Sequence, residues 1–271
     1  MITGAGAGIG ASIARRCGVL GMTVIATDVS SARAEETASK IREAGGQAEA
    51  KMVDVSNPEE LDRLAEYVFD RHGSVRLLVN NAGIETLGYS WEISAARWEK
   101  TLNTNVHGVV HGVRAFVPKM LASGQECWIT NVSSPAAFSQ IPLQTAYVMT
   151  KHAVQALSEC LFLEMQVKKA PIHVSCVIPG LLKTSIFEPE AGEGEPEGAS
   201  VFRNLMREGM YSAGMDVDVG CERIVDSIAA NQFWVDSQPE ITADFLTRRA
   251  AFLQDKQEPV VPELLKKMMG L

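Results

Sequence analysis

Short apolar runs rich in valine and isoleucine alternate along the chain with longer amphipathic stretches. The apolar runs predict strands at 23–27, 76–79, 128–132, 173–178 and 233–235, and a further strand that ends at 51–54. The amphipathic stretches predict helices at 32–44, 58–72, 146–169, 217–231 and 241–254, and one long helix or two short ones within 95–123. This alternation predicts an α/β fold in which a doubly wound parallel sheet carries helices on both faces.

The pattern becomes less regular after Thr184. Residues 188–200 are rich in Glu, Gly and Pro, a composition typical of a mobile, solvated loop. No internal repeat or domain linker interrupts the chain, so we expect residues 1–271 to form a single domain. Within it we expect a lid of loops and helices at about 185–215 and a C-terminal extension at about 238–271.

Composition excludes several classes of function. The chain has 271 residues, 46% of them hydrophobic, and a net charge of −8, which argues against nucleic acid or an anionic membrane as a partner. With no run of 18 apolar residues and no basic-then-apolar leader, we expect a cytoplasmic protein. The five cysteines are scattered, so we expect buried free thiols, and neither they nor the histidines have the spacing of a metal site.

Tyr147 and Lys151 are four residues apart on a predicted helix, which places a phenol and an ammonium about one turn apart on one face. An adjacent positive charge favours the phenolate, so Tyr147 is a candidate general acid/base near neutral pH. The Tyr-x-x-x-Lys pattern also arises by chance. It gains weight from Ser134, which precedes Tyr147 by 13 residues.

A glycine-rich segment, Thr3-Gly-Ala-Gly-Ala-Gly-Ile-Gly10, opens the chain. Its glycines permit a tight turn in which backbone N–H groups approach a pyrophosphate at a helix N-terminus, although a simple glycine turn has the same composition. Asp28 follows the next strand, 18 residues after Gly10, where a carboxylate accepts hydrogen bonds from a ribose and repels a 2′-phosphate. No Lys or Arg lies within the glycine turn or directly after Asp28, and Arg33 is the nearest basic residue downstream. The sequence therefore favours NAD over NADP in a Rossmann-type fold.

Two acidic residues in this region have simpler alternatives. Asp28 also fits a helix cap or a turn. Asp54 ends the third apolar run, where it is a candidate for contact with the adenine, and capping of the turn before Pro58 explains it nearly as well.

Several short motifs occur together in the order and spacing of a known family. Thr3-Gly-x-x-x-Gly-x-Gly10, Asn80-Asn-Ala-Gly83, Asn105, Ser134, Tyr147-x-x-x-Lys151 and Pro179-Gly180 resemble the short-chain dehydrogenase/reductase family. The resemblance covers residues 3–184, and the last third is similar only in layout.

The resemblance implies a role for each matching residue. Tyr147 would be the general acid/base, Lys151 would bind the nicotinamide ribose and lower the pKa of the tyrosine, and Ser134 would hydrogen-bond the substrate oxygen. Asn105 would hold a water that relays protons. The residues implied around the cofactor are Gly4, Gly8, Ile9, Gly10, Asp28, Asp54, Val55, Asn81, Ala82, Gly83, Tyr147, Lys151, Pro179, Gly180 and Thr184.

Simpler readings exist for some of these residues. Ser133 and Ser134 also fit an ordinary loop, with the spacing to Tyr147 favouring Ser134 as the catalytic one. Asn105 also fits a helix cap or a kink. The segment 80–83 also fits a plain turn after a strand.

The start of the chain departs from the family. Only Met1 and Ile2 precede Thr3, where family members carry a full first strand. Either the natural start is missing or the central strand is unusually short. A missing central strand would leave a trough in the core and weaken the glycine turn.

We therefore expect an NAD-dependent oxidoreductase that transfers a hydride between NAD(H) and a secondary alcohol or ketone. The residues around Ser134, Tyr147 and 181–187 are mostly apolar, which favours a hydrophobic or aromatic substrate. An NAD(H)-binding sensor without turnover and an NADPH-dependent ketone reductase are the alternatives. The resemblance also implies a homodimer or homotetramer that assembles through helices at about 105–123 and 147–168.

Overall fold

The computed structural model describes residues 1–188, 196–261 and 266. The helices in this part are α1 (Gly8–Val19), α2 (Ser31–Glu43), α3 (Pro58–His72), α4 (Ala95–Leu102), α5 (Gly108–Ser123), α6 (Thr145–Lys168), α7 (Glu197–Ala213), α8 (Val217–Ala229) and α9 (Pro239–Gln254). The strands are β1 (Thr23–Asp28), β2 (Gln47–Met52), β3 (Leu77–Asn80), β4 (Cys127–Val132), β5 (Ile172–Ile178) and β6 (Trp234–Asp236). A π-helical turn (Asn103–His107) joins α4 to α5, and a 3₁₀ helix (Pro135–Phe138) follows β4.

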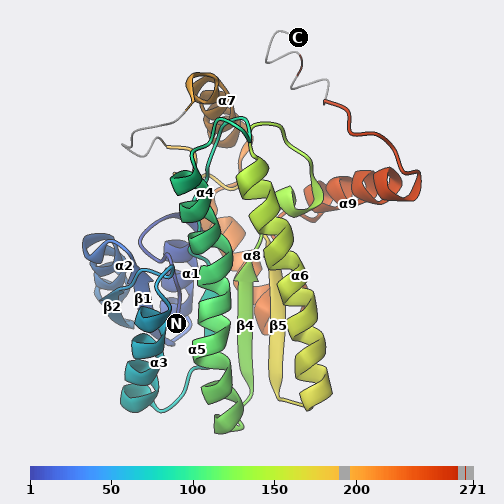
Figure 1. The fold of residues 1–271 in the computed structure, drawn as a ribbon. Helices are drawn as coiled ribbons and strands as arrows, with labels where there is room; N and C mark the ends of the chain where they lie inside the picture. Colours follow the sequence, from blue (N-terminus) through green and yellow to red (C-terminus); the bar gives the residue numbers. More distant parts are fainter. Residues whose placement is uncertain (189–195, 262–265, 267–271) are drawn as a thin grey trace.

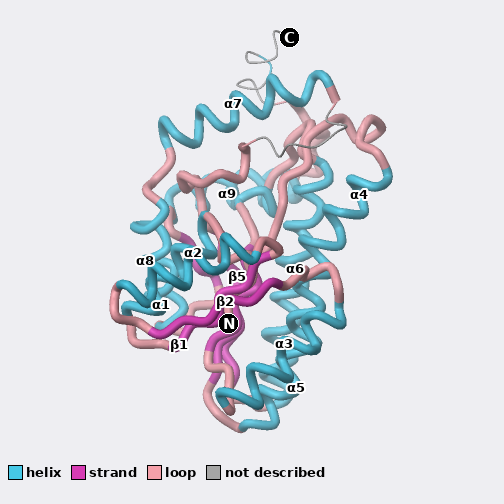
Figure 2. Tube along the Cα trace, turned by 90° about the vertical axis from the view of Figure 1, so that its left-hand side faces the viewer, coloured by secondary structure: helices cyan, strands magenta, loops and turns pink. Residues whose placement is uncertain are grey.

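The strands form two parallel ladders, β2-β1 and β3-β4-β5-β6, which Ile2 joins into one sheet by bridging β1 and β3. Helices cover both of its faces (Figure 1). Figure 2 shows α1 and α8 on one side of the sheet, α3, α5 and α6 on the other, and α7 across the end toward which the strands point. The predicted doubly wound α/β fold is therefore confirmed.

The first residues of the chain take the place of a central strand. Ile2 bridges Ala26 of β1 and Val79 of β3 in parallel register. Its N–H donates to the Ile25 carbonyl and its carbonyl accepts from the Thr27 N–H, both at 3.0 Å. Ile2 is 2% exposed, so at the level of the glycine turn these residues fill the trough that the short start led us to expect.

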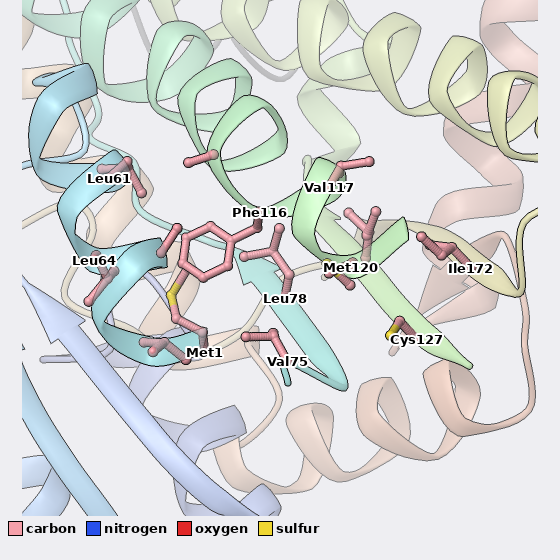
Figure 3. Packing of buried hydrophobic residues seen from close by; sticks show 14 of the residues in the cluster. Met1, Leu61, Leu64, Val75, Leu78, Phe116, Val117, Met120, Cys127 and Ile172 are labelled. Atoms are coloured by element: carbon pink, nitrogen blue, oxygen red, sulfur yellow. The ribbon is translucent and has the colours of Figure 1, made fainter. Parts of the chain in front are cut away.

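Buried apolar side chains join the sheet to the helices on each face. Figure 3 shows Phe116 of α5 packed with Leu78 of β3 and close to Leu61 of α3. All three are fully buried, and burial of such a side chain contributes about 1.5–3 kcal/mol to folding. This packing fixes α3 and α5 against the sheet.

The ends of the helices follow their sequence signals. Asn57 caps α3 by accepting a hydrogen bond from the Glu59 N–H, and Pro58 lies in the first turn. Gly73 and Gly124 end α3 and α5 with left-handed backbone angles, φ 75° and 63°.

The strand expected to end at 51–54 ends at Met52, within that range. Two expectations for secondary structure and burial were wrong. Within the loop expected at 188–200, α7 begins at Glu197, while 189–195 lies outside the described residues. Cys160 on α6 is exposed, whereas the other four cysteines are buried.

Among the described residues, no helix is long and apolar enough to cross a membrane.

Candidate active site

The glycine turn brings the N-terminus of α1 to the carboxyl edge of the sheet. Gly4 and Gly8 have φ values of 61° and 51°, a region that side chains disfavour. A Cβ atom on Gly10 would lie 2.3 Å from the Gly4 carbonyl oxygen. No side chain caps α1, so the N–H groups of its first turn face outward as an anion-binding end.

Asn81 and Thr3 tie this turn to the end of β3. The Asn81 side chain donates to the carbonyls of Thr3 and Gly4 at 2.9 and 3.1 Å. The Thr3 hydroxyl accepts from the N–H groups of Asn81 and Ala82 at 2.9 and 3.1 Å. These bonds give the segment 80–83 a function beyond a plain turn, since they hold the glycine turn in place.

Asp28 lies at the end of β1, beside the glycine turn. Its Oδ2 accepts from the Gly6 N–H at 3.1 Å, and its Oδ1 accepts from the Ser30 N–H and from Arg33 Nη2, both at 2.9 Å. Its side chain is only 8% exposed. Asp28 therefore organises the turn, and Arg33 neutralises part of its charge.

A cavity of about 310 Å³ opens above the glycine turn. It is lined by Gly6, Ala7, Gly8, Ala11, Arg15, Glu36, Thr37, Lys40, Lys183, Thr184, Ser185, Tyr211 and Val217. A Cβ atom on Gly8 would contact the Thr184 side chain at 3.4 Å, which places Thr184 over the N-terminus of α1. A cradle of glycines, an uncapped helix N-terminus and three basic side chains fit the pyrophosphate of a dinucleotide.

The structure gives Asp54 and Val55 mainly local roles. Asp54 Oδ1 accepts from the N–H and the hydroxyl of Ser56 at 2.9 and 2.7 Å, which is the turn-capping alternative. Val55 is 6% exposed and lies under α5, where a Cβ atom on Gly108 would approach it to 2.7 Å. Both residues still follow β2 at the carboxyl edge of the sheet.

The segment after β5 is held by two residues that sequence reasoning missed. The Gln238 side chain accepts from the Leu181 N–H at 2.6 Å, and the Ser237 hydroxyl donates to the Pro179 carbonyl. Gly180 adopts φ 71°, and a Cβ atom there would collide with Gln238. Both partners come from the start of the C-terminal extension, which gave no sequence signal.

Tyr147 and Lys151 lie on the first two turns of α6, as their spacing predicted. Lys151 Nζ is 5.3 Å from the centre of the Tyr147 ring and donates to the Val132 carbonyl at 2.9 Å. A Cβ atom on Gly83 would lie 3.6 Å from Lys151 Nζ. The pair is therefore buried between α6, the end of β4 and the segment after β3.

Of the two neighbouring serines, Ser134 faces the phenol. Its interaction with the phenol lowers the pKa of Tyr147, and its hydroxyl accepts from the Ala136 N–H at 3.1 Å. Ser133 is 2% exposed and donates to the Lys151 carbonyl at 3.0 Å, which is a structural role.

The protonation states of the pair differ from the sequence expectation. Burial raises the pKa of Tyr147 above its ordinary value, Glu85 raises it further, and the interaction with Ser134 opposes both. Burial lowers the pKa of Lys151 to about 8, because the ammonium loses its hydration. In the protein alone, Lys151 therefore does not make Tyr147 acidic.

Asn105 lies in the π-helical turn between α4 and α5. Its side chain accepts from the Ile84 N–H at 2.8 Å and donates to the Ile84 carbonyl and the Thr150 hydroxyl at 2.9 and 3.1 Å. It thus connects the segment after β3 to the helix of the catalytic pair. Isolated π turns recur at functional sites, because the extra residue redirects a side chain.

Sequence reasoning also missed Glu85. Its carboxyl accepts from Gln144 Nε2 and from the Thr86 N–H, both at 3.1 Å. A single Glu in a loop forms no sequence motif that would indicate a functional residue. Its position in the site depends on the helix that packs against it.

The doubly wound sheet and the glycine turn at its carboxyl edge are features of the dinucleotide-binding class. The family model for short chain dehydrogenases matches residues 1–193, and the chain belongs to this family.

Three relatives illustrate the similarity. The solved structure of a short-chain dehydrogenase/reductase from Burkholderia phymatum in complex with NAD is 30% identical, with a TM-score of 0.90, and the match covers 96% of this chain and 95% of that one. The 3beta-hydroxysteroid dehydrogenase 1 of Eggerthella lenta is 34% identical over 80% of this chain and 82% of its own length. The "Probable oxidoreductase EphD" of Mycobacterium tuberculosis is 35% identical over 68% of this chain. The matched region spans only 31% of the length of that protein.

Proposed function

We propose that the protein is an NAD-dependent oxidoreductase that transfers a hydride between NAD(H) and a secondary alcohol or ketone. The observation that carries this proposal is the convergence of Ser134, Tyr147 and Lys151 beside Gly83 and the glycine turn. A proton-transfer group and an anion-binding helix end meet at one edge of the sheet, where open α/β sheets bind their ligands.

In this mechanism Tyr147 exchanges a proton with the substrate oxygen, and Ser134 holds that oxygen by a hydrogen bond. Bound NAD supplies the hydride acceptor and, when oxidised, a positive charge that favours the phenolate. Lys151 holds the nicotinamide ribose and adds its own charge when protonated. Asn105 positions the segment 83–85 and would orient the water that returns protons to solvent.

The glycine turn and its neighbours would hold the dinucleotide. Gly4, Gly8, Ile9 and Gly10 would line the pyrophosphate, with Thr184 above them, and Asp28 would bind the adenosine ribose. Asp54 and Val55 would flank the adenine. Asn81, Ala82 and Gly83 would form the floor beneath the nicotinamide, and Pro179 and Gly180 would lie at its carboxamide.

NAD is the preferred cofactor in this proposal because Asp28 presents a carboxylate where a 2′-phosphate would lie. The relative from Burkholderia phymatum, which is in complex with NAD, supports this choice. The ion pair with Arg33 weakens the repulsion of a phosphate, so we expect a preference rather than exclusion of NADP.

The substrate in this proposal is a hydrophobic or aromatic secondary alcohol, or the corresponding ketone. Apolar side chains (Leu87, Leu143 and Phe202) form a buried cluster between α7 and the segments that flank Tyr147. The relative named as a 3beta-hydroxysteroid dehydrogenase supports an apolar substrate. We take the described part of residues 185–215, which includes α7, as the lid over this substrate; residues 189–195 lie outside the described residues.

The test is replacement of Tyr147 with Phe, followed by NADH absorbance with a panel of secondary alcohols. We expect turnover to fall by at least about a hundredfold while NADH still binds, because general acid–base catalysis contributes about 10²–10⁴-fold. Tyr67→Phe is the matched control, since the Tyr67 hydroxyl on α3 donates to Glu49 of the edge strand β2, away from the glycine turn and Tyr147. Unchanged turnover in Tyr147→Phe would eliminate the proposed role, and NADH binding without turnover in the wild type would favour a sensor.

A further inference from the structure

Glu85 places a carboxyl group in the site, and the proposed mechanism does not use this group. Gln144, which holds its Oε2, is 2% exposed and directly precedes α6, three residues before Tyr147. The backbone of the preceding residue, Ile84, is fixed on both sides by Asn105. The carboxyl is therefore held against the first turn of the helix that carries the catalytic pair.

Three ionisable side chains from two helices interact electrostatically with this carboxyl. Tyr147 and Lys151 come from α6, and Arg203 comes from α7. Arg203 is 8% exposed. Its neighbour Phe202 packs on Leu87 and Leu143, so the docking of α7 sets how near the guanidinium lies to Glu85.

The carboxyl is also able to change its charge under ordinary conditions. Burial raises the pKa of Glu85 to about 8, and the Thr86 N–H, followed by Arg203, Gln144 and Lys151, opposes this rise. At neutral pH the group is mostly protonated. A closer guanidinium would favour the anion, and a more distant one would favour the neutral acid.

We propose that Glu85 is a positioning residue for the proposed reaction, which sets the charge balance of the Tyr147–Lys151 pair and links that balance to helix α7 through Arg203. A neutral Glu85 leaves the Lys151 charge unopposed, which favours the Tyr147 phenolate. An ionised Glu85 repels the phenolate and pairs with the ammonium. The inference rests on the proposed function for its effect on turnover.

The first test is the pH profile of kcat/KM for alcohol oxidation in Glu85→Gln. Glutamine keeps the shape and accepts the Thr86 hydrogen bond but carries no charge. We expect the rising limb of the profile to move to lower pH by about one unit, because the anion that opposes the phenolate is lost. Arg203→Met should shift the pH profile when position 85 is the natural Glu. In the Glu85→Gln variant, the same substitution should leave the pH dependence of kcat/KM unchanged.

Glu188→Gln is the matched control. Glu188 also contacts α7, through Arg207 and Tyr211, but it does not face Tyr147. Loss of a contact to α7 by itself should therefore leave the pH dependence as in the wild type.

A second test does not require turnover. The free energy of unfolding is measured for the wild type, Glu85→Gln, Lys151→Met and the double variant at pH 6 and pH 8. We expect the coupling between positions 85 and 151 to be larger at pH 8, where the Glu85 anion forms, than at pH 6.

The outcomes separate the two proposals. A wild type that oxidises no alcohol and reduces no ketone overturns the proposed function, while the coupling at pH 8 still decides the link between Glu85 and Lys151. Two outcomes overturn the role of Glu85. One is a coupling of zero between positions 85 and 151 at both pH values, and the other is an active wild type whose kcat/KM profile is not shifted by Glu85→Gln.

Discussion

Tyr147 lies where burial works against its ionisation. The interaction with Ser134 favours the phenolate, but burial and Glu85 outweigh it. A spacing of four residues correctly placed Lys151 next to the ring, yet spacing says nothing about how much water the two groups lose. The position of this pair was predictable from the sequence, whereas its protonation state depends on tertiary burial.

The cofactor preference depends on a single carboxylate. Asp28→Asn keeps the size of the side chain and removes its charge, so we expect the preference for NADH over NADPH to fall by about tenfold, or about 1.4 kcal/mol. Dissociation constants for both cofactors, measured by fluorescence titration, would show this. Asp62→Asn is the control, because Asp62 forms a similar ion pair with Arg114 away from the glycine turn. Tighter binding of NADPH than NADH by the wild type would contradict our interpretation of Asp28.

At the scale of elements, the central strands and the helices beside them were predictable because buried parallel strands give continuous apolar runs. The edge strand β2 has the burial pattern of a partly exposed strand, so the sequence pattern indicated its end but not its start. The start of α7 was hidden because it follows a segment rich in Glu, Gly and Pro, while the helix is positioned by packing on Leu87 and Leu143. Such long-range packing leaves no local pattern.

The docking of α7 should depend on Phe202, which is 3% exposed. Phe202→Ala removes its packing, at a cost of about 3–5 kcal/mol for a fully buried Phe, so α7 should loosen before the sheet does. Hydrogen exchange should then quicken across 197–213 with little change in β4 and β5. Val201→Ala on the same helix is the control, since Val201 is 59% exposed. Equal exchange in both variants would show that α7 is held by something else.

At the scale of the whole molecule, α6 presents apolar side chains that no described element of the chain covers. Leu163 is 57% exposed and Val167 is 83% exposed. Together with the exposed Val110 on α5, they support the proposed homodimer or homotetramer through these two helices. The sequence indicated two apolar helix faces, but only the structure separates the part that covers the sheet from the part left for a partner.

Leu163→Glu should reduce the assembled state, because a buried unpaired carboxylate opposes association. Light scattering after size-exclusion chromatography would show a smaller species than the wild type. Val19→Glu is the control, since Val19 is 71% exposed at the end of α1, on the other face of the sheet. A wild type that is already monomeric, or an unchanged mass in Leu163→Glu, would rule out this interface.

The π-helical turn that holds Asn105 has a consequence for insertions and deletions. An α-helix advances by about 100° per residue, so a chain shorter by one residue between α4 and α5 could close into one regular helix. Such a deletion would fold readily, and it would rotate the amide of Asn105 away from Ile84. The deletion that makes the helix regular would therefore break the hydrogen bonds that hold the segment after β3 against Asn105. We expect the effects of a deletion on folding and on activity to differ most at 103–107.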